Sequence, residues 1–276
     1  MNTEPFAPVH SPMVEDADGP MLKVDLHMHS SEDPRDALDY DARELIRHAA
    51  GLDFDVIAIT LHGKVIQDEG LAEFAANRGV LFIPGIEKCI HRKEVLVFNV
   101  TQAEMDAVDT WEDLRALKQR RGNDMLVVAP HPFFKKSQCL GRHLEENIDI
   151  FDAIEYCHLY TRLWNLNRKA VRVAESHRKP LLATSDAHAL WMLGKNYTWV
   201  EARPTMASVF AAIRAGRVKP HSEPLSPWGV AYKLGWALVF HETRKLRRAL
   251  TGKSPTPVSS PAPDRRSSRK VNPTTA

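Results

Sequence analysis

The sequence predicts an α/β fold in which parallel strands alternate with helices. It favours a barrel over an open sheet. Two observations support this. Short apolar runs rich in Val, Ile and Leu, typical of buried parallel strands, recur along the chain between segments with helical periodicity. The seven or eight resulting β/α repeats favour a barrel. With 276 residues, of which 43% are hydrophobic, the chain can build one large domain or two modest ones.

The strands are expected in the apolar runs. These are Leu22–Met28, Asp55–Thr60, Val80–Pro84, Glu94–Val100, Leu126–Ala129, Asp152–Tyr156, Pro180–Thr184 and Thr198–Glu201. Helices are expected where apolar residues recur three and four positions apart. These segments are Asp41–Ala50, Asp68–Asn77, Trp111–Arg121, Trp164–Arg178 and Thr205–Arg214. Several of them end near a glycine, which readily adopts the left-handed conformation that closes a helix.

Outside this α/β domain, which is predicted over residues 21–225, the chain changes character. Residues 1–20 are acidic and lack the apolar core of a signal peptide, so they predict a flexible leader. Residues 226–250 predict an amphipathic basic helix, whose apolar part is shorter than the roughly 20 residues that span a bilayer. Residues 251–276, rich in Pro, Ser, Thr and Arg, predict a disordered basic tail.

Charge and cysteine content bear on partners and compartment. The formal net charge is +2, but residues 226–276 hold ten Lys or Arg against two acids, so the rest of the chain is acidic. Such a basic segment suits an anionic surface, a membrane or a nucleic acid, although simple packing of its helix on the barrel is the plainer alternative. Cys89, Cys139 and Cys157 have no CxxC spacing and cannot all pair, which predicts a reducing, cytoplasmic setting.

Polar residues that could bind metal follow the apolar runs, where the active site of a parallel barrel lies. His27 and His29 have the i, i+2 spacing that puts both imidazoles on one side of an extended chain. Later runs are followed by the other candidates, which are His62, Glu87, His131, Asp186 and His188. A lone histidine after a strand is usually structural, but this coincidence predicts a metal site. Imidazole and carboxylate ligands without cysteine suit Zn²⁺, Mn²⁺ or Fe²⁺, and their number implies two or three ions.

The remaining histidines are interpreted as ordinary ones. Those in helical, leader, loop or tail contexts are His10, His48, His143, His177, His221 and His241. His91 and His158 stay open because each lies close to a candidate site residue.

Over residues 21–205 the sequence resembles the PHP (polymerase and histidinol phosphatase) superfamily of metal-dependent phosphoesterases. The motifs are Asp25-Leu26-His27-Met28-His29-Ser30, Ile59-Thr60-Leu61-His62, Pro84-Gly85-Ile86-Glu87, Pro130-His131-Pro132 and Ser185-Asp186-Ala187-His188. The resemblance implies a distorted (β/α)7 TIM-like barrel with up to three metal ions at its mouth. It also implies that His27, His29, Glu87 and Asp186 hold one ion. Glu87 and His131 would share a second, and His62 and His188 would hold a third.

The sequence departs from the family pattern at a few positions. Leu61-His62 stands where the family usually has Asp-His. A further histidine usually follows Glu87, whereas this chain has Glu94, with His91 nearby. The third ion commonly takes a ligand soon after the histidine pair. Residues 31–36 offer several carboxylates, of which Asp33 is the choice here.

The expected function is metal-dependent hydrolysis of a phosphoester, as a phosphatase or phosphodiesterase, by a metal-bridging hydroxide in a multinuclear site. Asp186 and His188 are candidate catalytic residues for protonating the leaving oxygen, with a metal-bound water as the alternative. The substrate is expected to be a small phosphorylated molecule or a short nucleic acid. Basic residues beyond the site segments can recognise phosphate or simply be surface residues, and these are Lys135, Lys136, Arg162 and Lys195.

Two alternatives compete with this function. An amidohydrolase-type metal hydrolase also begins with a His-x-His strand, but it usually adds a lysine or glutamate bridge in mid-barrel and ends in one aspartate. A non-catalytic PHP-like module that binds nucleic acid or membrane is the other. The full set of seven candidate ligands argues against that module.

Overall fold

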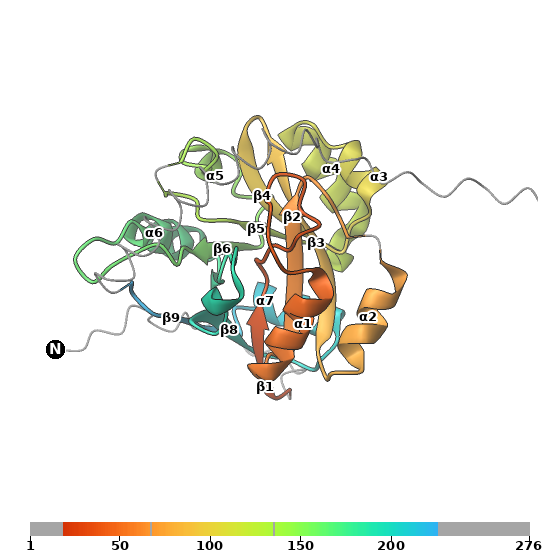
Figure 1. Cartoon of the computed structure of the whole chain (residues 1–276). Coiled ribbons are helices and arrows are strands. Elements are labelled where there is room, and N and C mark those ends of the chain that lie inside the picture. The colour runs from red at the N-terminus through yellow and green to blue at the C-terminus, as the bar shows by residue number, and fades with distance from the viewer. Residues whose placement is uncertain (1–18, 67, 135, 226–276) are drawn as a thin grey trace, which may run out of the picture. The chain divides into compact units, whose positions relative to one another are not determined.

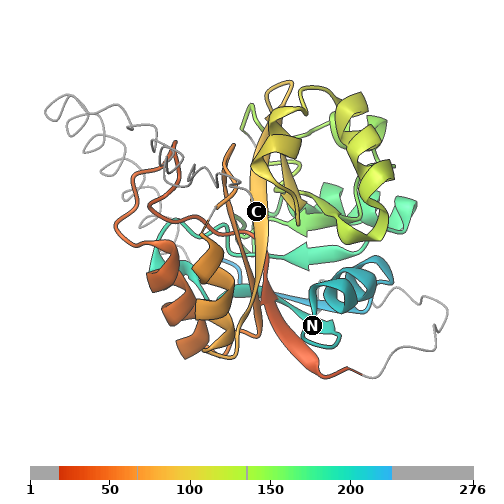
Figure 2. The ribbon, with the colours of Figure 1, turned by 90° about the vertical axis from the view of Figure 1, so that its right-hand side faces the viewer.

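The computed structural model describes residues 19–66, 68–134 and 136–225 (Figures 1 and 2). The chain divides into two compact units, Met1–Gly235 and Trp236–Ala276, and the second lies wholly outside the described residues. The predicted helix over 226–250 and the predicted tail over 251–276 also fall outside them, as does the leader apart from residues 19 and 20. Within the described part of the chain, no helix has the length and apolarity needed to cross a membrane.

One sheet of nine strands runs through the described residues, in the order β7-β6-β5-β4-β3-β2-β1-β8-β9. The strands are β1 Met21–Asp25, β2 Val56–His62, β3 Leu81–Ile90, β4 Lys93–Phe98, β5 Leu126–Ala129, β6 Ala153–Tyr156, β7 Leu181–Ala183, β8 Asn196–Glu201 and β9 Val218–Ser222. The helices are α1 Ala42–Gly51, α2 Glu69–Ala76, α3 Gln102–Asp106, α4 Trp111–Arg121, α5 His143–Glu146, α6 Asn167–His177 and α7 Met206–Arg214. Two short 3-10 turns, Gly122–Asp124 and Leu190–Met192, complete the list.

The sheet curves until its ends nearly meet, which confirms the predicted barrel-like α/β fold. The hydroxyl of Thr198 in β8 donates to the carbonyl of Ala183 in β7 at 2.9 Å. The backbone N–H of Ala183 donates back to that hydroxyl oxygen at 2.8 Å. A side chain therefore replaces the backbone ladder at the seam.

The prediction of parallel strands is wrong for two of them, β4 and β8, which pair antiparallel with their neighbours. β4 pairs antiparallel with both β3 and β5. Its connection to β3 is only His91 and Arg92, both with positive φ (46° and 65°), as in a tight hairpin. A parallel crossover needs a dozen residues or more, so this turn dictates the reversal. β9 escaped prediction because Pro220 interrupts it, as is permitted at a sheet edge.

Strand direction decides where the site lies. Six strands run parallel, so their carboxyl ends share one rim of the sheet, and these are β1, β2, β3, β5, β6 and β7. Because β4 runs the other way, its first residues lie at that same rim. The residues after the parallel strands and the start of β4 therefore converge.

The core has two apolar clusters, one on each face of the sheet. Along β4, Leu96 and Phe98 belong to the cluster that α7 joins, whereas Val95 and Val97 belong to the cluster containing α3, α4 and α6. This alternation follows the period of two in a strand. Both faces are thus buried, which explains why the strands read as continuous apolar runs.

Local sequence determines where the helices begin. Asp41 accepts from the backbone N–H of Glu44, and Glu44 reaches back to the backbone N–H of Asp41, forming a capping box for α1.

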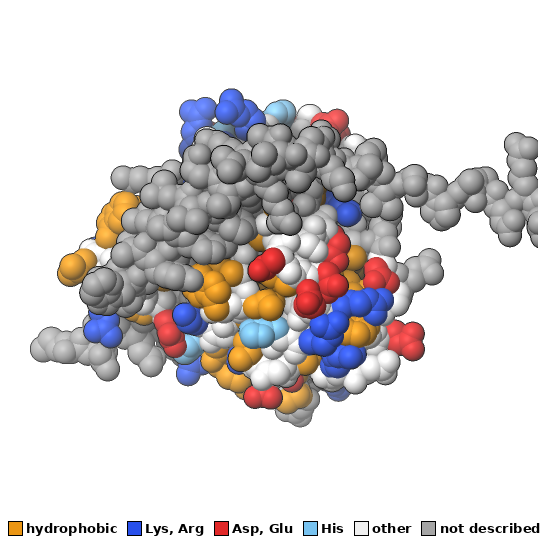
Figure 3. Space-filling view, viewed as in Figure 1, with side chains coloured by type: hydrophobic (Ala, Val, Ile, Leu, Met, Phe, Trp, Pro, Cys, Tyr) orange, Lys and Arg blue, Asp and Glu red, His pale blue; other side chains and the backbone are white. Residues whose placement is uncertain are grey.

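Helices α1 and α2 lie side by side on one side of β1, with α7 on the other (Figure 2). Figure 3 shows basic side chains gathered over α1 and α2, where Arg43 and Arg78 stack on Phe74.

Candidate metal centre

The shared rim brings together all nine predicted metal ligands. His27 and His29 follow β1, His62 ends β2, Glu87 lies in β3, Glu94 lies in β4, His131 follows β5, and Asp186 and His188 follow β7. Asp33 reaches the rim from the loop after β1. Each of the nine side chains lies within 4 Å of another member of the set.

Four buried side chains surround one point at the centre of the rim. Nε2 of His27 lies 3.6 Å from Oε2 of Glu87 and 3.4 Å from Oδ1 of Asp186. Nε2 of His29 lies 3.5 Å and 3.4 Å from the same two oxygens. A tetrahedral ion with ligand bonds of about 2.0–2.1 Å places its ligands about 3.3–3.4 Å apart. The four atoms therefore fit a divalent ion.

The histidine nitrogens of this group support the fit. Nε2 of His27 and Nε2 of His29 are buried and have no hydrogen-bond partner among the described residues. A buried polar atom without a partner costs about 1–3 kcal/mol, so folded proteins rarely keep one without a reason. A metal ion accepting both lone pairs supplies that reason.

The other ring nitrogens of these histidines are held by carboxylates. Nδ1 of His27 lies 2.9 Å from Oε2 of Glu155, and Nδ1 of His29 lies 2.9 Å from Oδ2 of Asp33. A carboxylate on Nδ1 fixes the proton there and leaves Nε2 as the ligand atom. Glu155 escaped the sequence analysis. The available signal was an acid inside the otherwise apolar strand β6.

A second group extends from Glu87 towards β4. While Oε2 of Glu87 faces His27 and His29, its Oε1 lies 3.4 Å from Nε2 of His131. Oε2 of Glu94 lies 3.9 Å from that same nitrogen. Glu87 thus lies between the two groups, in the position of a bridging carboxylate.

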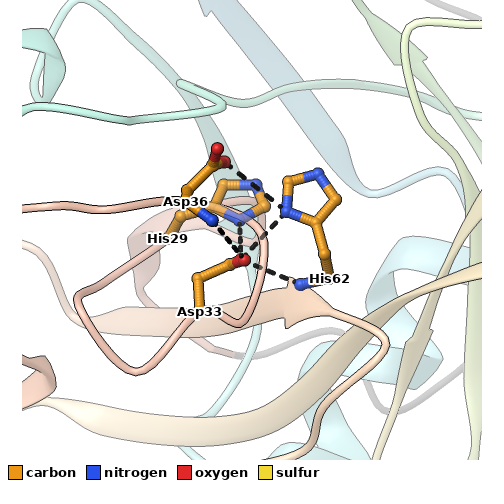
Figure 4. Close-up of side chains that lie close together, drawn as sticks. All are labelled: His29, Asp33, Asp36 and His62. Atoms are coloured by element: carbon orange, nitrogen blue, oxygen red, sulfur yellow. Dashed lines mark hydrogen bonds and ion pairs between the residues drawn. The ribbon is translucent and has the colours of Figure 1, made fainter. Parts of the chain in front are cut away.

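A third group lies where the loop after β1 meets the end of β2 (Figure 4). Oδ2 of Asp33 lies 2.9 Å from Nδ1 of both His29 and His62 and also accepts the backbone N–H of His62 at 2.9 Å. Oδ2 of Asp36 lies 3.6 Å from Nδ1 of His62 and 2.9 Å from Nε2 of His188. Asp36, which the sequence analysis passed over in favour of Asp33, therefore lies between the two histidines assigned to the third ion.

Electrostatics in the group favour bound positive charge. Burial by itself raises the pKa of Asp186, but the imidazoles of His27, His29 and His188 hold it well below its usual value. Burial lowers the pKa of His27, yet Asp186, Glu155 and Glu87 raise it well above its usual value. The carboxylates thus stay ionised and attract cations, as a metal centre requires.

Backbone conformation at two ligands is unusual. His131 has φ of 28° and Asp186 has φ of 46°, in the left-handed region that non-glycine residues rarely adopt. Such strain clusters at functional sites, where surrounding structure over-determines it. Near Asp186, the buried Asp25 carboxyl accepts the backbone N–H groups of His27 and Ser185, joining the segments after β1 and β7.

Comparison with known proteins agrees with this architecture. Residues 164–218 match the family described as PHP-associated. No curated protein sequence matches the chain. A two-domain protein from Bacteroides vulgatus, described as containing a predicted PHP-like metal-dependent phosphoesterase, shares the fold with a TM-score of 0.57 at 16% identity. The similarity covers 80% of this chain and 70% of that one.

Two further structures share the fold. PsfC from Pseudomonas syringae has a TM-score of 0.56 at 20% identity and covers 83% of this chain and 99% of its own. The lesion-specific endonuclease PfuEndoQ from Pyrococcus furiosus has a TM-score of 0.52 at 16% identity, covering 73% of this chain and 58% of its own. The chain therefore shares the fold of these structures, and its residues 164–218 match the PHP-associated family.

Proposed function

We propose that this chain is a metal-dependent phosphoesterase that hydrolyses a phosphoester at the rim of the barrel. The observation that carries the proposal is the group formed by His27, His29, Glu87 and Asp186, with two buried Nε2 atoms aimed at two carboxylate oxygens. A fold shared with a predicted PHP-like metal-dependent phosphoesterase supports the reaction class.

In this proposal the ligands divide among two or three ions. His27, His29, Glu87 and Asp186 hold the first. His131 and Glu87 hold the second, with Glu94 as a further ligand. His62 and His188 hold the third, with Asp36 or Asp33 completing the set. Zn²⁺, Mn²⁺ and Fe²⁺ suit such mixed nitrogen and oxygen ligands.

The chain's own groups have separate tasks in the reaction. Bound divalent ions supply Lewis acidity and lower the pKa of water. Glu155 and Asp33 keep the Nε2 atoms of His27 and His29 directed into the centre. The His188 side chain is 26% exposed, more than the other candidate ligands, and Asp36 lies 2.9 Å from its Nε2. If the site holds only the first two ions, His188 is available for proton delivery to the leaving oxygen, with Asp186, 3.5 Å from its Nδ1, orienting it.

The finer features of the proposal concern substrate and compartment. The substrate is a small phosphorylated molecule or a short nucleic acid. The nucleic acid stays a candidate because an endonuclease shares the fold. A cytoplasmic setting agrees with Cys89, Cys139 and Cys157 being free thiols. Contact of the basic C-terminal segment with an anionic surface is a further part of the proposal.

A direct test measures bound metal and the release of p-nitrophenol from a phosphate monoester and a phosphate diester. The wild type is compared with His27→Ala and Asp186→Ala, and with His48→Ala in α1 as a matched control away from the rim. We expect metal-dependent turnover in the wild type and the control, and a loss of about 100-fold or more in both site variants. Absence of metal-dependent turnover in the wild type contradicts the proposal, and turnover of an amide alone favours the amidohydrolase alternative.

A further inference from the structure

The loop after β1 brings a cation, Arg35, to the side of the metal centre that holds Glu94. Nη1 of Arg35 lies 3.2 Å from Oε1 of Glu94. The other oxygen of Glu94 lies 3.9 Å from Nε2 of His131. A single carboxylate therefore separates the guanidinium from a proposed metal ligand.

The backbone of Arg35 is anchored by a group at the rim. The backbone N–H of Arg35 donates to Oδ1 of Asp33 at 2.7 Å, and the other oxygen of Asp33 holds His29 and His62. The Glu94 side chain is 8% exposed, whereas that of Arg35 is 47% exposed. The backbone of Arg35 is thus fixed at the centre, while its guanidinium group is exposed enough to contact an anion from solvent.

A second cation, Lys136, is attracted by the carboxylates of the centre. Burial by itself lowers the pKa of Lys136, but attraction to Asp186, Glu94 and Glu87 raises it, so its ammonium stays charged. Lys136 belongs to the loop after β5, which is fastened to β4 by the backbone N–H of Glu94 donating to the carbonyl of Gln138 at 2.9 Å. Arg35 therefore pairs with Glu94 directly, and Lys136, from a separate loop, is attracted by the same carboxylate.

We propose that Arg35 recognises the terminal phosphate of a phosphomonoester, an inference that rests on the proposed function. A guanidinium presents its N–H donors in a planar fork that matches the oxygens of phosphate. A monoester, whose second pKa is about 6, carries close to one more negative charge at pH 7 than a diester. Arg35 exchanges Glu94 for this dianion when substrate enters, and so favours monoesters over diesters.

The kinetic test compares Arg35→Met and Arg35→Lys with the wild type on p-nitrophenyl phosphate and on bis(p-nitrophenyl) phosphate. Arg115→Met is the matched control, because Nε of Arg115 forms an ion pair with Asp149 at 2.6 Å outside the site. We expect Arg35→Met to lower kcat/KM for the monoester by about 10- to 100-fold, the loss of a hydrogen bond to a charged group. Diester turnover should change by less than about 3-fold, and Arg35→Lys should be intermediate because it keeps the charge without the fork.

A binding measurement keeps this inference separate from the hydrolase proposal. Calorimetry of the Mn²⁺- or Zn²⁺-loaded protein with inorganic phosphate should show an affinity about 10-fold or more weaker in Arg35→Met, and an unchanged affinity in Arg115→Met. Equal phosphate affinity in Arg35→Met and wild type overturns the inference, as does an equal loss of monoester and diester turnover. If the wild type turns over neither ester, the proposed function fails, and the phosphate affinities alone decide the role of Arg35.

Discussion

Nδ1 of His27 lies 2.9 Å from Oε2 of Glu155, and both side chains are fully buried. Among the residues that the structure describes, His27 is the candidate ligand that pairs with Glu155, so the effect of Glu155 on the metal passes through His27. In Glu155→Gln the amide no longer holds the Nδ1 proton by charge, and His27 becomes a weaker ligand. We expect metal affinity to fall by about 10- to 100-fold.

Metal titration of the purified chain measures this effect. Glu145→Gln is the control, because Glu145 is exposed on α5. An affinity equal to that of the wild type would show that His27 needs no orienting carboxylate.

The two aspartates of the loop after β1 are expected to act differently. Asp33 accepts three hydrogen bonds that join His29 to His62, so Asp33→Ala should lower the free energy of unfolding of the metal-free chain by about 1.5–3 kcal/mol. Asp36→Ala should lower the free energy of unfolding of the metal-free chain less than Asp33→Ala does. It should also reduce the number of ions bound. Urea unfolding and metal analysis of both variants test this assignment. If Asp33→Ala loses a bound ion without any loss of stability and Asp36→Ala loses none, then Asp33 is the metal ligand and this assignment is wrong.

Metal binding should depend on pH through His27. Burial lowers the pKa of this imidazole, but Asp186, Glu155 and Glu87 raise it well above its usual value. The metal-free chain therefore holds a proton there at neutral pH, and an ion must displace it. Affinity should rise as pH increases through this raised pKa. Calorimetry in buffers of different ionisation enthalpy counts the released protons, and binding without proton release would contradict the expectation.

Gly85 should tolerate no side chain. A Cβ at this position in β3 would lie 2.8 Å from Cγ2 of Thr60 and 2.9 Å from Cδ1 of Phe98, between the neighbouring strands β2 and β4. Gly85→Ala should lower the free energy of unfolding by about 1–3 kcal/mol through overpacking. Gly51→Ala is the control, since a Cβ there meets nothing within 4 Å. Equal unfolding midpoints in urea for the two variants would rule out this crowding.

The sequence by itself identified the barrel-like fold and the side chains that meet at its rim. Polar residues that directly follow buried apolar runs, such as His62 after β2 and His131 after β5, are found from local pattern alone. Because parallel strands share one rim, position at a strand end is enough to place them together. The family resemblance added Glu94 and Asp33 from the same local segments.

Only the tertiary structure decided how these side chains are oriented and which of them are partners. The carboxylate of Glu155 reaches His27 across 128 residues, and no local pattern pairs a buried acid with a particular histidine. The hairpin of His91 and Arg92 reverses β4 and so carries Glu94 to the rim beside Arg35. Choices between Nδ1 and Nε2, and between Asp33 and Asp36, depend on separations of a few ångströms that packing determines.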